Sequence, residues 1–244
     1  MLQDNGRASQ APDRAARRPR PLDAFTGSLA QRAYQSLREA ILNLDYLPGE
    51  ALRKRDICAA LGVSRSPVSE AIARLAQEGL VQVVPQAGTY VARFSLHEIR
   101  EGAFLREAIE LAAIELVAPA ITDDQLVQLR RNLRLQEAHM AEGDFPGFYR
   151  ADREFHALIL SFTGFRRLGQ VADTAFVHVD RARQLILPAP GRVAETLEEH
   201  RAVFAALEAR DPPRAREEMR RHLRQLLTRL APLEREHPDL FNPG

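Results

Sequence analysis

A chain of 244 residues is long enough for one large domain or two modest ones. Its 45% hydrophobic and 27% charged residues are typical of a globular protein and exclude a disordered or collagen-like chain. The single cysteine, Cys58, excludes a disulfide scaffold and an all-cysteine zinc module, and favours a reducing compartment. Glu110 and Glu115 interrupt the longest apolar stretch, around 108–121, and the N-terminus lacks a signal-peptide core. We therefore expect a cytoplasmic protein that does not enter a membrane.

The formal net charge of +1 hides an uneven distribution of charge along the chain. Residues 1–95 carry 13 Lys and Arg against 9 Asp and Glu, whereas residues 96–244 carry 21 against 24. A basic first part is consistent with a module that binds a polyanion. Residues 1–26 have no apolar periodicity and are expected to form a flexible basic arm, unless the true start lies downstream.

The next segment predicts a compact module with three helices and two strands. Helical spacing of apolar residues from Leu29 to Leu44 predicts a first helix, which Pro48-Gly49 ends. Two further helices over about 55–61 and 64–79 are joined by a glycine-containing turn. β-branched residues on both sides of 85–88 then predict a hairpin. This order is that of a winged helix-turn-helix, expected over 27–95.

The third of these helices has two different faces. Val68, Ile72 and Leu75 should pack on the second helix, on Ile57, Leu61 and Val63. Arg65, Ser66 and Ser69 then point outward near the N-terminus, where a helix in the major groove contacts base edges. Ser64 or Ser66 is expected to cap the helix, and arginine matches the edge of guanine. The alternative is an ordinary solvent-exposed helix start.

After about residue 94 the pattern is wholly helical. Helices are expected over 97–120, 123–142, 146–162, 166–187, 192–209 and 213–233. Short loops between amphipathic helices predict an antiparallel bundle over 96–235, followed by a tail over 236–244. The predicted fold class is therefore mainly α, with an N-terminal winged helix-turn-helix and a C-terminal all-helical bundle.

Four residues of the predicted bundle have the chemistry of metal ligands. Asp152 and His156 lie four apart on one helix and project from the same face. His200 and His222 lie centrally on two later helices and could meet them inside the bundle. Imidazole with carboxylate suits Zn, Ni, Fe, Mn or Cu. The alternative is that each histidine is a surface residue or a satisfied core residue, as we expect for His97, His139, His178 and His237.

The front module resembles a known family. The run Leu61-Gly-Val-Ser-Arg-Ser-Pro-Val-Ser-Glu-Ala-Ile-Ala-Arg-Leu-Ala-Gln-Glu-Gly-Leu-Val81, with Leu47-Pro-Gly-Glu50 and Gly88-Thr-Tyr-Val91, resembles the DNA-binding domain of GntR-family bacterial transcription regulators over 28–92. The resemblance implies DNA contacts by Arg55, Ser64, Arg65, Ser66 and Gly88. Two departures are Ser69, where the family usually has arginine, and Gln86-Ala87, where a basic residue is common.

The rear half, over about 97–230, resembles the FCD ligand domain of the FadR-type branch of that family. The resemblance rests on Leu105-Arg-Glu-Ala-Ile-Glu110, Phe148-Tyr-Arg-Ala-Asp-Arg-Glu-Phe-His156, Glu199-His200 and Met219-Arg-Arg-His-Leu223. It implies that Asp152, His156, His200 and His222 ligate a divalent transition metal (Zn, Ni, Mn or Fe). It also implies a small organic or sugar acid as effector, with Arg106 facing the effector pocket. One departure is Phe165, where asparagine is common. Arg181 and Arg183 could line the pocket or pair with acids on neighbouring helices, and we expect the pairing.

These patterns predict a DNA-binding transcription regulator, acting as a repressor, that binds a palindromic operator as a homodimer under effector control. The helix that starts near His97 is expected to transmit the effector signal. Two alternatives are a metal-dependent hydrolase and a regulator whose metal is purely structural. The hydrolase needs a positioned general base, and Glu199 should point about 100° away from His200.

Overall fold

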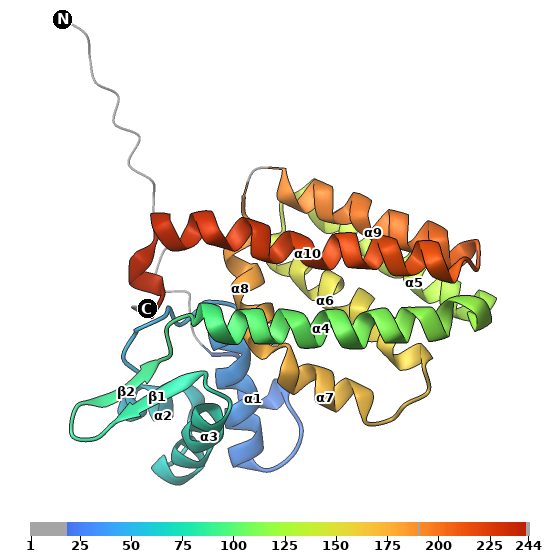
Figure 1. Ribbon diagram of the computed structural model, residues 1–244. Coiled ribbons are helices and arrows are strands. Elements are labelled where there is room, and N and C mark those ends of the chain that lie inside the picture. Colours follow the sequence, from blue (N-terminus) through green and yellow to red (C-terminus); the bar gives the residue numbers. More distant parts are fainter. Residues whose placement is uncertain (1–18, 190, 243–244) are drawn as a thin grey trace, which may run out of the picture.

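The computed structural model describes residues 19–189 and 191–242 and contains two packed parts (Figure 1). A small winged domain lies beneath one end of a bundle of long helices. The predicted fold class, mainly α with a winged helix-turn-helix followed by a helical bundle, is confirmed. Within the described ranges, no helix combines the length and the apolar character that a membrane span would need.

The winged domain consists of α1 (Leu29–Leu42), α2 (Lys54–Leu61), α3 (Arg65–Gln77), β1 (Val81–Val84) and β2 (Gly88–Val91). The two strands pair antiparallel, with Val81 opposite Val91. Helix α1 ends at Leu42, earlier than predicted, because Leu44 adopts a left-handed backbone conformation with φ of 59° that turns the chain. The chain then runs beside β2, where the Gly49 N–H donates to the Val91 carbonyl at 2.8 Å.

The two faces of α3 are arranged as its periodicity predicts. Val68, Ile72 and Leu75 are at most 2% exposed and share one hydrophobic core with Ile57 of α2. Arg65 and the rest of the opposite face are exposed, apart from residues at its edge. Burial of the apolar face holds α3 against α1 and α2 and leaves its N-terminal turn open to a partner.

Residues 1–26 were predicted to form a flexible arm, but the last residues of this segment are ordered against the winged domain. Residues 22–24 form a 3₁₀ turn, and Leu22 is buried in the core of the winged domain. The Ser36 hydroxyl donates to the Arg20 carbonyl oxygen at 2.6 Å. This segment therefore packs on α1, because Leu22 removes apolar surface from water there. Residues 1–18 of the predicted arm lie outside the described residues.

The bundle contains α4 (Leu96–Val117), α5 (Asp123–Glu142), α6 (Phe145–Phe162), α7 (Leu168–Ala175), α8 (Val177–Ile186), α9 (Arg192–Glu208) and α10 (Pro212–Glu236). Helix α4 packs on α6 and α10, and α5 packs on α6 and α9. Short 3₁₀ turns follow α4 (Ala118–Ala120) and α10 (Pro238–Leu240). Most of the core of the bundle lies between these long helices, around Phe148, Phe155 and Leu197.

The single helix predicted over 166–187 is wrong, because the structure has α7 and α8 in its place. The break lies at Phe176, whose φ of −95° and ψ of 0° leave the regular helical range. Helix α4 packs directly against this break. A Cβ atom on Gly102 would lie 3.1 Å from the Ala175 carbonyl oxygen, so glycine permits the close approach. The break redirects α8 toward the winged domain.

The two parts of the molecule share a packed joint. Val177 at the start of α8 belongs to the hydrophobic core of the winged domain. The Phe94 ring, in the link between the parts, lies 5.5 Å from the Phe241 ring. The backbone of Phe94 exchanges hydrogen bonds with Leu240 and Asn242, at 2.9 and 2.8 Å. The described part of the predicted tail therefore closes onto the link.

Candidate metal centre and adjoining pocket

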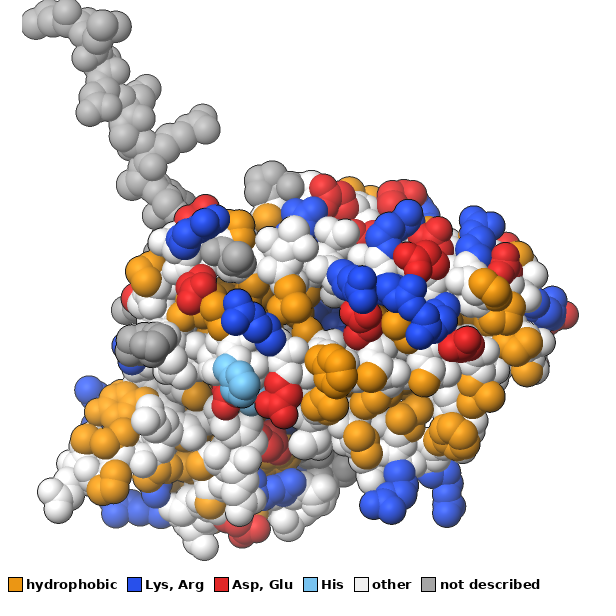
Figure 2. Space-filling model, viewed as in Figure 1, with side chains coloured by type: hydrophobic (Ala, Val, Ile, Leu, Met, Phe, Trp, Pro, Cys, Tyr) orange, Lys and Arg blue, Asp and Glu red, His pale blue; other side chains and the backbone are white. Residues whose placement is uncertain are grey.

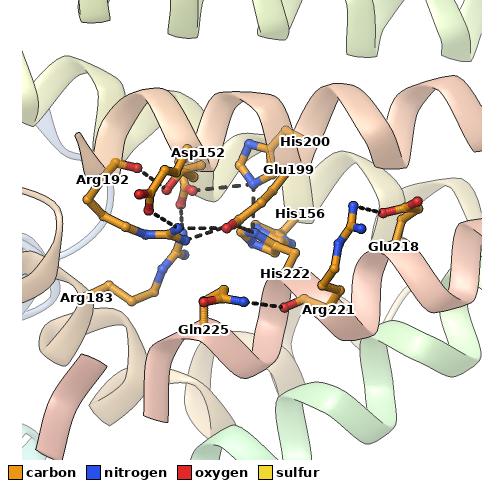
Figure 3. A network of polar contacts seen from close by, with 12 residues as sticks. Asp152, His156, Arg183, Arg192, Glu199, His200, Glu218, Arg221, His222 and Gln225 are labelled. Carbon is orange, nitrogen blue, oxygen red and sulfur yellow. Dashed lines mark hydrogen bonds and ion pairs between the residues drawn. The ribbon is translucent and has the colours of Figure 1, made fainter. Parts of the chain in front are cut away.

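Helices α6, α9 and α10 bring three histidines together inside the bundle (Figure 3). His200 Nε2 lies 3.3 Å from His222 Nε2, which in turn lies 3.2 Å from His156 Nε2. The three side chains are at most 5% exposed. We call His156, His200 and His222 the histidine cluster. Residues that are 66 positions apart in the sequence thus direct the same ring atom at one point.

Asp152 adds a carboxylate to the histidine cluster. It lies one turn before His156 on α6 and is 0% exposed. Its Oδ2 atom accepts a hydrogen bond from Arg183 Nη2. Its Oδ1 atom lies 3.6 Å from His200 Nε2 and has no hydrogen-bond partner among the described residues. A buried carboxylate oxygen without a donor is costly, so this atom is suited to a cation.

Two glutamates fix the orientation of two of the rings. His156 Nδ1 lies 2.5 Å from Glu110 Oε2, and His222 Nδ1 lies 2.7 Å from Glu199 Oε2. An ionised carboxylate only accepts hydrogen bonds, so each Nδ1 carries the proton. The Nε2 atom of each neutral ring is then left with a lone pair directed into the histidine cluster.

An amide relay orients the third ring. His200 Nδ1 lies 2.8 Å from Gln136 Oε1. The Gln136 amide donates from Nε2 to Asn132 Oδ1 at 2.7 Å, and Asn132 donates to the Ala151 carbonyl at 2.9 Å. This chain of donors makes Gln136 Oε1 an acceptor, so the proton of His200 also resides on Nδ1.

The surroundings set the charge state of the four groups. Burial, with nearby cationic groups, holds the pKa of His156 and of His200 well below the usual range, and burial lowers the pKa of His222. Burial opposes ionisation of Asp152, but Arg183 and the imidazoles reverse this and lower the pKa of the carboxyl. The result is three neutral imidazoles beside one carboxylate.

This donor set fits a divalent transition metal. The Nε2 lone pair of His222 lies 3.2–3.3 Å from the Nε2 atoms of His156 and His200, and such lone pairs repel unless a cation lies between them. Two nitrogen ligands of one tetrahedral ion, each at 2.0–2.1 Å, are about 3.4 Å apart. Asp152, His156, His200 and His222 would therefore hold the ion, with Glu110, Gln136 and Glu199 as their outer partners. The three predicted histidines lie together, and Asp152 lies 3.6 Å from one of them, His200.

The sequence did not reveal these outer partners. Glu199 was expected to point away from the site, but α10 packs along α9 so that the Glu199 carboxylate reaches His222. Arg192 holds the same carboxylate with two hydrogen bonds, at 2.7 and 2.8 Å. Burial opposes ionisation of Glu199, yet the hydrogen bonds from His222 and Arg192 lower its pKa to about 2. For Glu110, the available signal was its i,i+4 spacing from Arg106 on an apolar helix.

Arg181 and Arg183, which were both expected to pair with acids, have different surroundings. Arg183 pairs with Asp152, as predicted. Arg181 is 1% exposed, and its guanidinium lies 4.6 Å from the centre of the Phe94 ring. Its Nε and Nη2 atoms have no hydrogen-bond partner within the described ranges. Burial lowers the pKa of Arg181 to about 10, and Glu98 on the neighbouring helix α4 opposes this shift electrostatically without a hydrogen bond to those atoms.

A pocket of about 640 Å³ adjoins the histidine cluster and contains His156 in its wall. Its basic lining residues are Arg106, Arg150, Arg153, Arg166 and Arg183, and its acidic ones are Glu154, Asp173 and Asp180. We call this the arginine pocket. Arg106, expected to face an effector, is 5% exposed and donates from Nε to Glu110 Oε1 at 2.6 Å. Phe165 also lines the pocket and is 63% exposed. Arg106, Arg153 and Arg183 pair with Glu110, Asp180 and Asp152, whereas no ion pair is seen for Arg150 or Arg166 among the described residues, and these two guanidinium groups favour an anionic ligand.

The residues expected to contact DNA lie on the winged domain. The Arg55 side chain is 84% exposed and pairs with Asp56 at 3.3 Å. Ser64 occupies the N-cap position of α3 but makes no side-chain capping hydrogen bond. Arg65, Ser66 and Gly88 are exposed, and Ser69 is half-buried. The first turn of α3 thus presents one guanidinium and hydroxyls to solvent, as a major-groove helix requires.

A winged helix-turn-helix with an open, basic helix start, joined to an all-helical bundle with a buried polar site, defines a class of DNA-binding transcription regulators. Residues 29–91 match the family model of bacterial regulatory proteins of the gntR family, and residues 101–225 match the FCD domain. The chain therefore belongs to the GntR family, with an FCD domain at its C-terminal side. Membership of this family makes it a transcription regulator and not an enzyme.

Similar proteins support this assignment. A Streptomyces ambofaciens protein described as an HTH-type transcriptional regulator in an unstable DNA locus is 37% identical over 85% of this chain and 87% of its own length. The HTH-type transcriptional repressor RspR of Escherichia coli K12 is 30% identical over 89% of this chain and 95% of its own. A putative GntR regulator from Rhodococcus sp. RHA1 superimposes with a TM-score of 0.73 at 27% identity, over 83% and 99% of the two chains.

Proposed function

We propose that this regulator is a repressor whose operator affinity is set by a small organic or sugar acid bound beside a divalent transition metal. One observation carries the proposal: His156, Arg106 and Arg183 belong to the polar network of the histidine cluster and also line the arginine pocket. A ligand in this pocket would therefore meet positive charge from the bound metal and from the arginines of the pocket wall. The repressor role is supported by the name of the Escherichia coli relative.

Asp152, His156, His200 and His222 would hold the metal, which is Zn, Ni, Mn or Fe by ligand type. An ion that takes more than four ligands would supply, beside the four protein ligands, a coordination position for a carboxylate oxygen. The arginines of the pocket bind and orient the remainder of the acid, and the apolar Leu160 and Phe176 exclude water from its carbon chain. The metal on one side of the pocket and the arginines on the other thus favour a small acid as the effector.

On the operator, two winged domains of a homodimer would read the two halves of a palindrome. Arg65 is suited to a base edge, whereas Arg55, Ser64, Ser66 and Ser69 are suited to phosphates. Gly88 at the wing lets backbone approach DNA closely, since its φ of 138° disfavours a side chain.

The experiment begins by selecting the operator from random-sequence DNA. Fluorescence anisotropy then measures operator affinity of the metal-loaded protein against a panel of mono-, di- and tricarboxylic acids. We expect one class of acid to lower operator affinity by about 5- to 150-fold. If no acid changes the affinity of metal-loaded protein, the alternative of a purely structural metal is favoured.

A pocket variant sharpens this experiment. Arg106→Ala is a poor choice, because it would also leave Glu110, the partner of His156, without its cation. Arg150 and Arg166 line the pocket and are exposed, so Arg150→Ala/Arg166→Ala should keep metal and operator binding and lose effector affinity. Arg134→Ala, an exposed arginine on α5 outside the pocket, is the matched control.

A further inference from the structure

The described end of the chain folds back onto the link between the two parts of the molecule, residues 92–95. After α10, residues 237–242 turn toward the start of α4, as the red end of the chain shows (Figure 1). The Phe94 N–H donates to the Leu240 carbonyl oxygen at 2.9 Å, and the Asn242 N–H donates to the Phe94 carbonyl oxygen at 2.8 Å. We call residues 237–242 the strap, because they lie along the link and bond to both backbone groups of Phe94.

One aromatic side chain anchors the strap. Phe241 is 3% exposed and packs on the Phe94 ring in an apolar cluster with residues of α8 and α10. Arg93 Nε adds a hydrogen bond to the Asp239 carbonyl oxygen at 3.0 Å, but this bond joins an exposed side chain to the backbone. An exposed hydrogen bond adds little net stability, whereas a buried phenyl ring removes a large apolar area from water. Attachment of the strap therefore depends chiefly on Phe241.

The ring that receives Phe241 also lies over a buried cation. Arg181 of α8 is 1% exposed, and its guanidinium carbon lies 4.6 Å from the centre of the Phe94 ring. Its Nε and Nη2 atoms have no hydrogen-bond partner in the described part of the chain. A guanidinium that is buried without acceptors loses hydration free energy, which a cation–π contact regains only in part. An opening of the link to water would therefore stabilise Arg181.

We propose that the strap is a releasable clamp on the link, closed by Phe241 and poised to open by the buried charge of Arg181. Two opposing contributions act at one ring. Burial of Phe241 on Phe94 favours the closed strap, and hydration of Arg181 favours the open one. The charge thus brings the free energies of the two states closer together, and the strap opens without unfolding of the bundle. None of the six described strap residues lines the arginine pocket, so this device is separate from the effector site.

The position of the strap matters because the chain crosses from the winged domain to the bundle at the link. The winged domain also touches α8, since Val177 lies in its core, and α7, through Arg38. On the face drawn in Figure 2, packed side chains join the winged domain at the lower left to the bundle above it. With the strap open, these contacts remain as a pivot, about which the winged domain turns without separating from the bundle. A closed strap thus fixes the direction in which α3 faces DNA.

Hydrogen exchange of the full chain without DNA measures opening of the strap, because a protected amide exchanges only when its hydrogen bond breaks. In the wild type, the Phe94 and Asn242 amides should exchange at least about 100-fold faster than buried amides in the middle of α5, which report global unfolding. Phe241→Ala should speed exchange of the two amides at least about 30-fold further, because the anchor is lost. Phe145→Ala is the matched control, since Phe145 is 45% exposed at the start of α6 and lies outside the cluster.

The sign of a second effect separates a clamp from ordinary packing. Arg181→Met keeps an apolar contact with the Phe94 ring but removes the charge, so it should slow exchange of the same two amides at least about 5-fold. If Arg181 only supported the ring, its loss would speed exchange, as Phe241→Ala does, and the proposal would be wrong. Phe241→Leu, which keeps part of the buried area, serves if Phe241→Ala folds poorly and should give a smaller acceleration.

Spin labels test whether the strap holds the winged domain. In a Cys58→Ser background, labels on the exposed positions Gln82→Cys of β1 and Leu135→Cys of α5 report the distance between the two parts. Dilution with unlabelled protein restricts the signal to pairs within one chain. Phe241→Ala should broaden the distance distribution, and Arg181→Met should leave it at least as narrow as in the wild type. Faster exchange in Phe241→Ala with an unchanged distribution would show that the strap does not fix the winged domain, and would overturn the proposal.

Discussion

Glu110 joins the arginine pocket to the histidine cluster through a single carboxylate. Its Oε1 atom accepts from Arg106 at 2.6 Å and its Oε2 atom lies 2.5 Å from His156 Nδ1. Both partners and Glu110 itself are at most 5% exposed, so little solvent is available to replace a lost contact. A change at this residue should therefore affect both His156, the proposed metal ligand, and Arg106 in the wall of the pocket.

We predict that Glu110→Gln weakens metal binding about 10- to 100-fold, the effect typical of lost outer partners. Glutamine keeps the volume and one acceptor, but it no longer neutralises Arg106. Competition with a chelating dye measures the metal affinity. The matched control, Glu107→Gln, removes a half-buried acid from the same helix that pairs with Arg224. Similar losses in both variants would show that the charge of α4, and not the contact with His156, is responsible.

Arg65 is the residue whose loss should affect the reading of DNA sequence. It is exposed on the first turn of α3, where side chains reach base edges. Arg65→Ala should weaken operator binding by about 1 to 3 kcal/mol and affect random DNA much less. Arg55→Ala is the comparison, because a phosphate contact lowers affinity for both DNAs alike. Fluorescence anisotropy with operator and with random DNA at one salt concentration measures both affinities. An equal loss of affinity for the two DNAs in Arg65→Ala would make Arg65 a phosphate contact.

At the scale of elements, α7 and α8 lie between the arginine pocket and the winged domain. Asp173 of α7 lines the pocket, and its carbonyl oxygen accepts from Arg38 Nη2 of α1 at 2.9 Å. Arg38 Nε also donates to Glu78, the C-cap of α3, at 3.0 Å. The start of α4, expected to transmit the signal, approaches the same joint, where Glu98 lies 3.7 Å from His178. Arg38 thus connects the pocket wall with the C-terminal end of α3, the helix proposed to read DNA.

We expect Arg38→Ala to uncouple the two sites. The ratio of operator affinities without and with the active acid should fall toward one, because a ligand shifts an equilibrium only through contacts that differ between states. Calorimetric titration of the acid, with and without operator, should give the same reduced ratio, since coupling is reciprocal. Arg20→Ala is the control, because Arg20 pairs with Glu39 of the same helix α1. An unchanged ratio would remove Arg38 from the connection.

For the whole molecule, a metal bound at the histidine cluster would cross-link helices. Its ligands come from α6, α9 and α10, and Glu110 adds α4. A metal bound there stabilises the folded state alone. The gain is about 2.7 kcal/mol when free metal is 100 times its dissociation constant.

Metal removal should therefore lower Tm, and calorimetry with and without chelator measures the shift. His200→Ala should lower the Tm and make it insensitive to chelator, because one buried ligand of the site is lost. His139→Ala is the matched control, since His139 pairs with Asp144 at a half-exposed position outside the site. A chelator effect of the same size in His200→Ala would place the stabilising metal elsewhere.

The sequence by itself determined the features that depend on neighbours along one helix or hairpin. The buried face of α3 and the alignment of Asp152 with His156 follow from the 3.6-residue period, which any helical segment obeys. The β-branched residues and turn likewise predicted the wing. The proximity of His200 and His222 was inferred less directly, from their central positions on later helices and from family resemblance.

The tertiary structure alone decided which side chains meet across helices. The break at Phe176, the contact of Glu199 with His222 and the packing of Leu22 on α1 depend on how whole helices are placed. The segment around Phe176 contains β-branched and aromatic residues of low helix propensity, but the position of the break and the close approach of α4 at Gly102 are seen only in the tertiary structure. Periodicity fixes the direction of a side chain relative to its own helix axis. The distance and angle between two axes come from the packing of all their contact residues at once, which no local pattern contains.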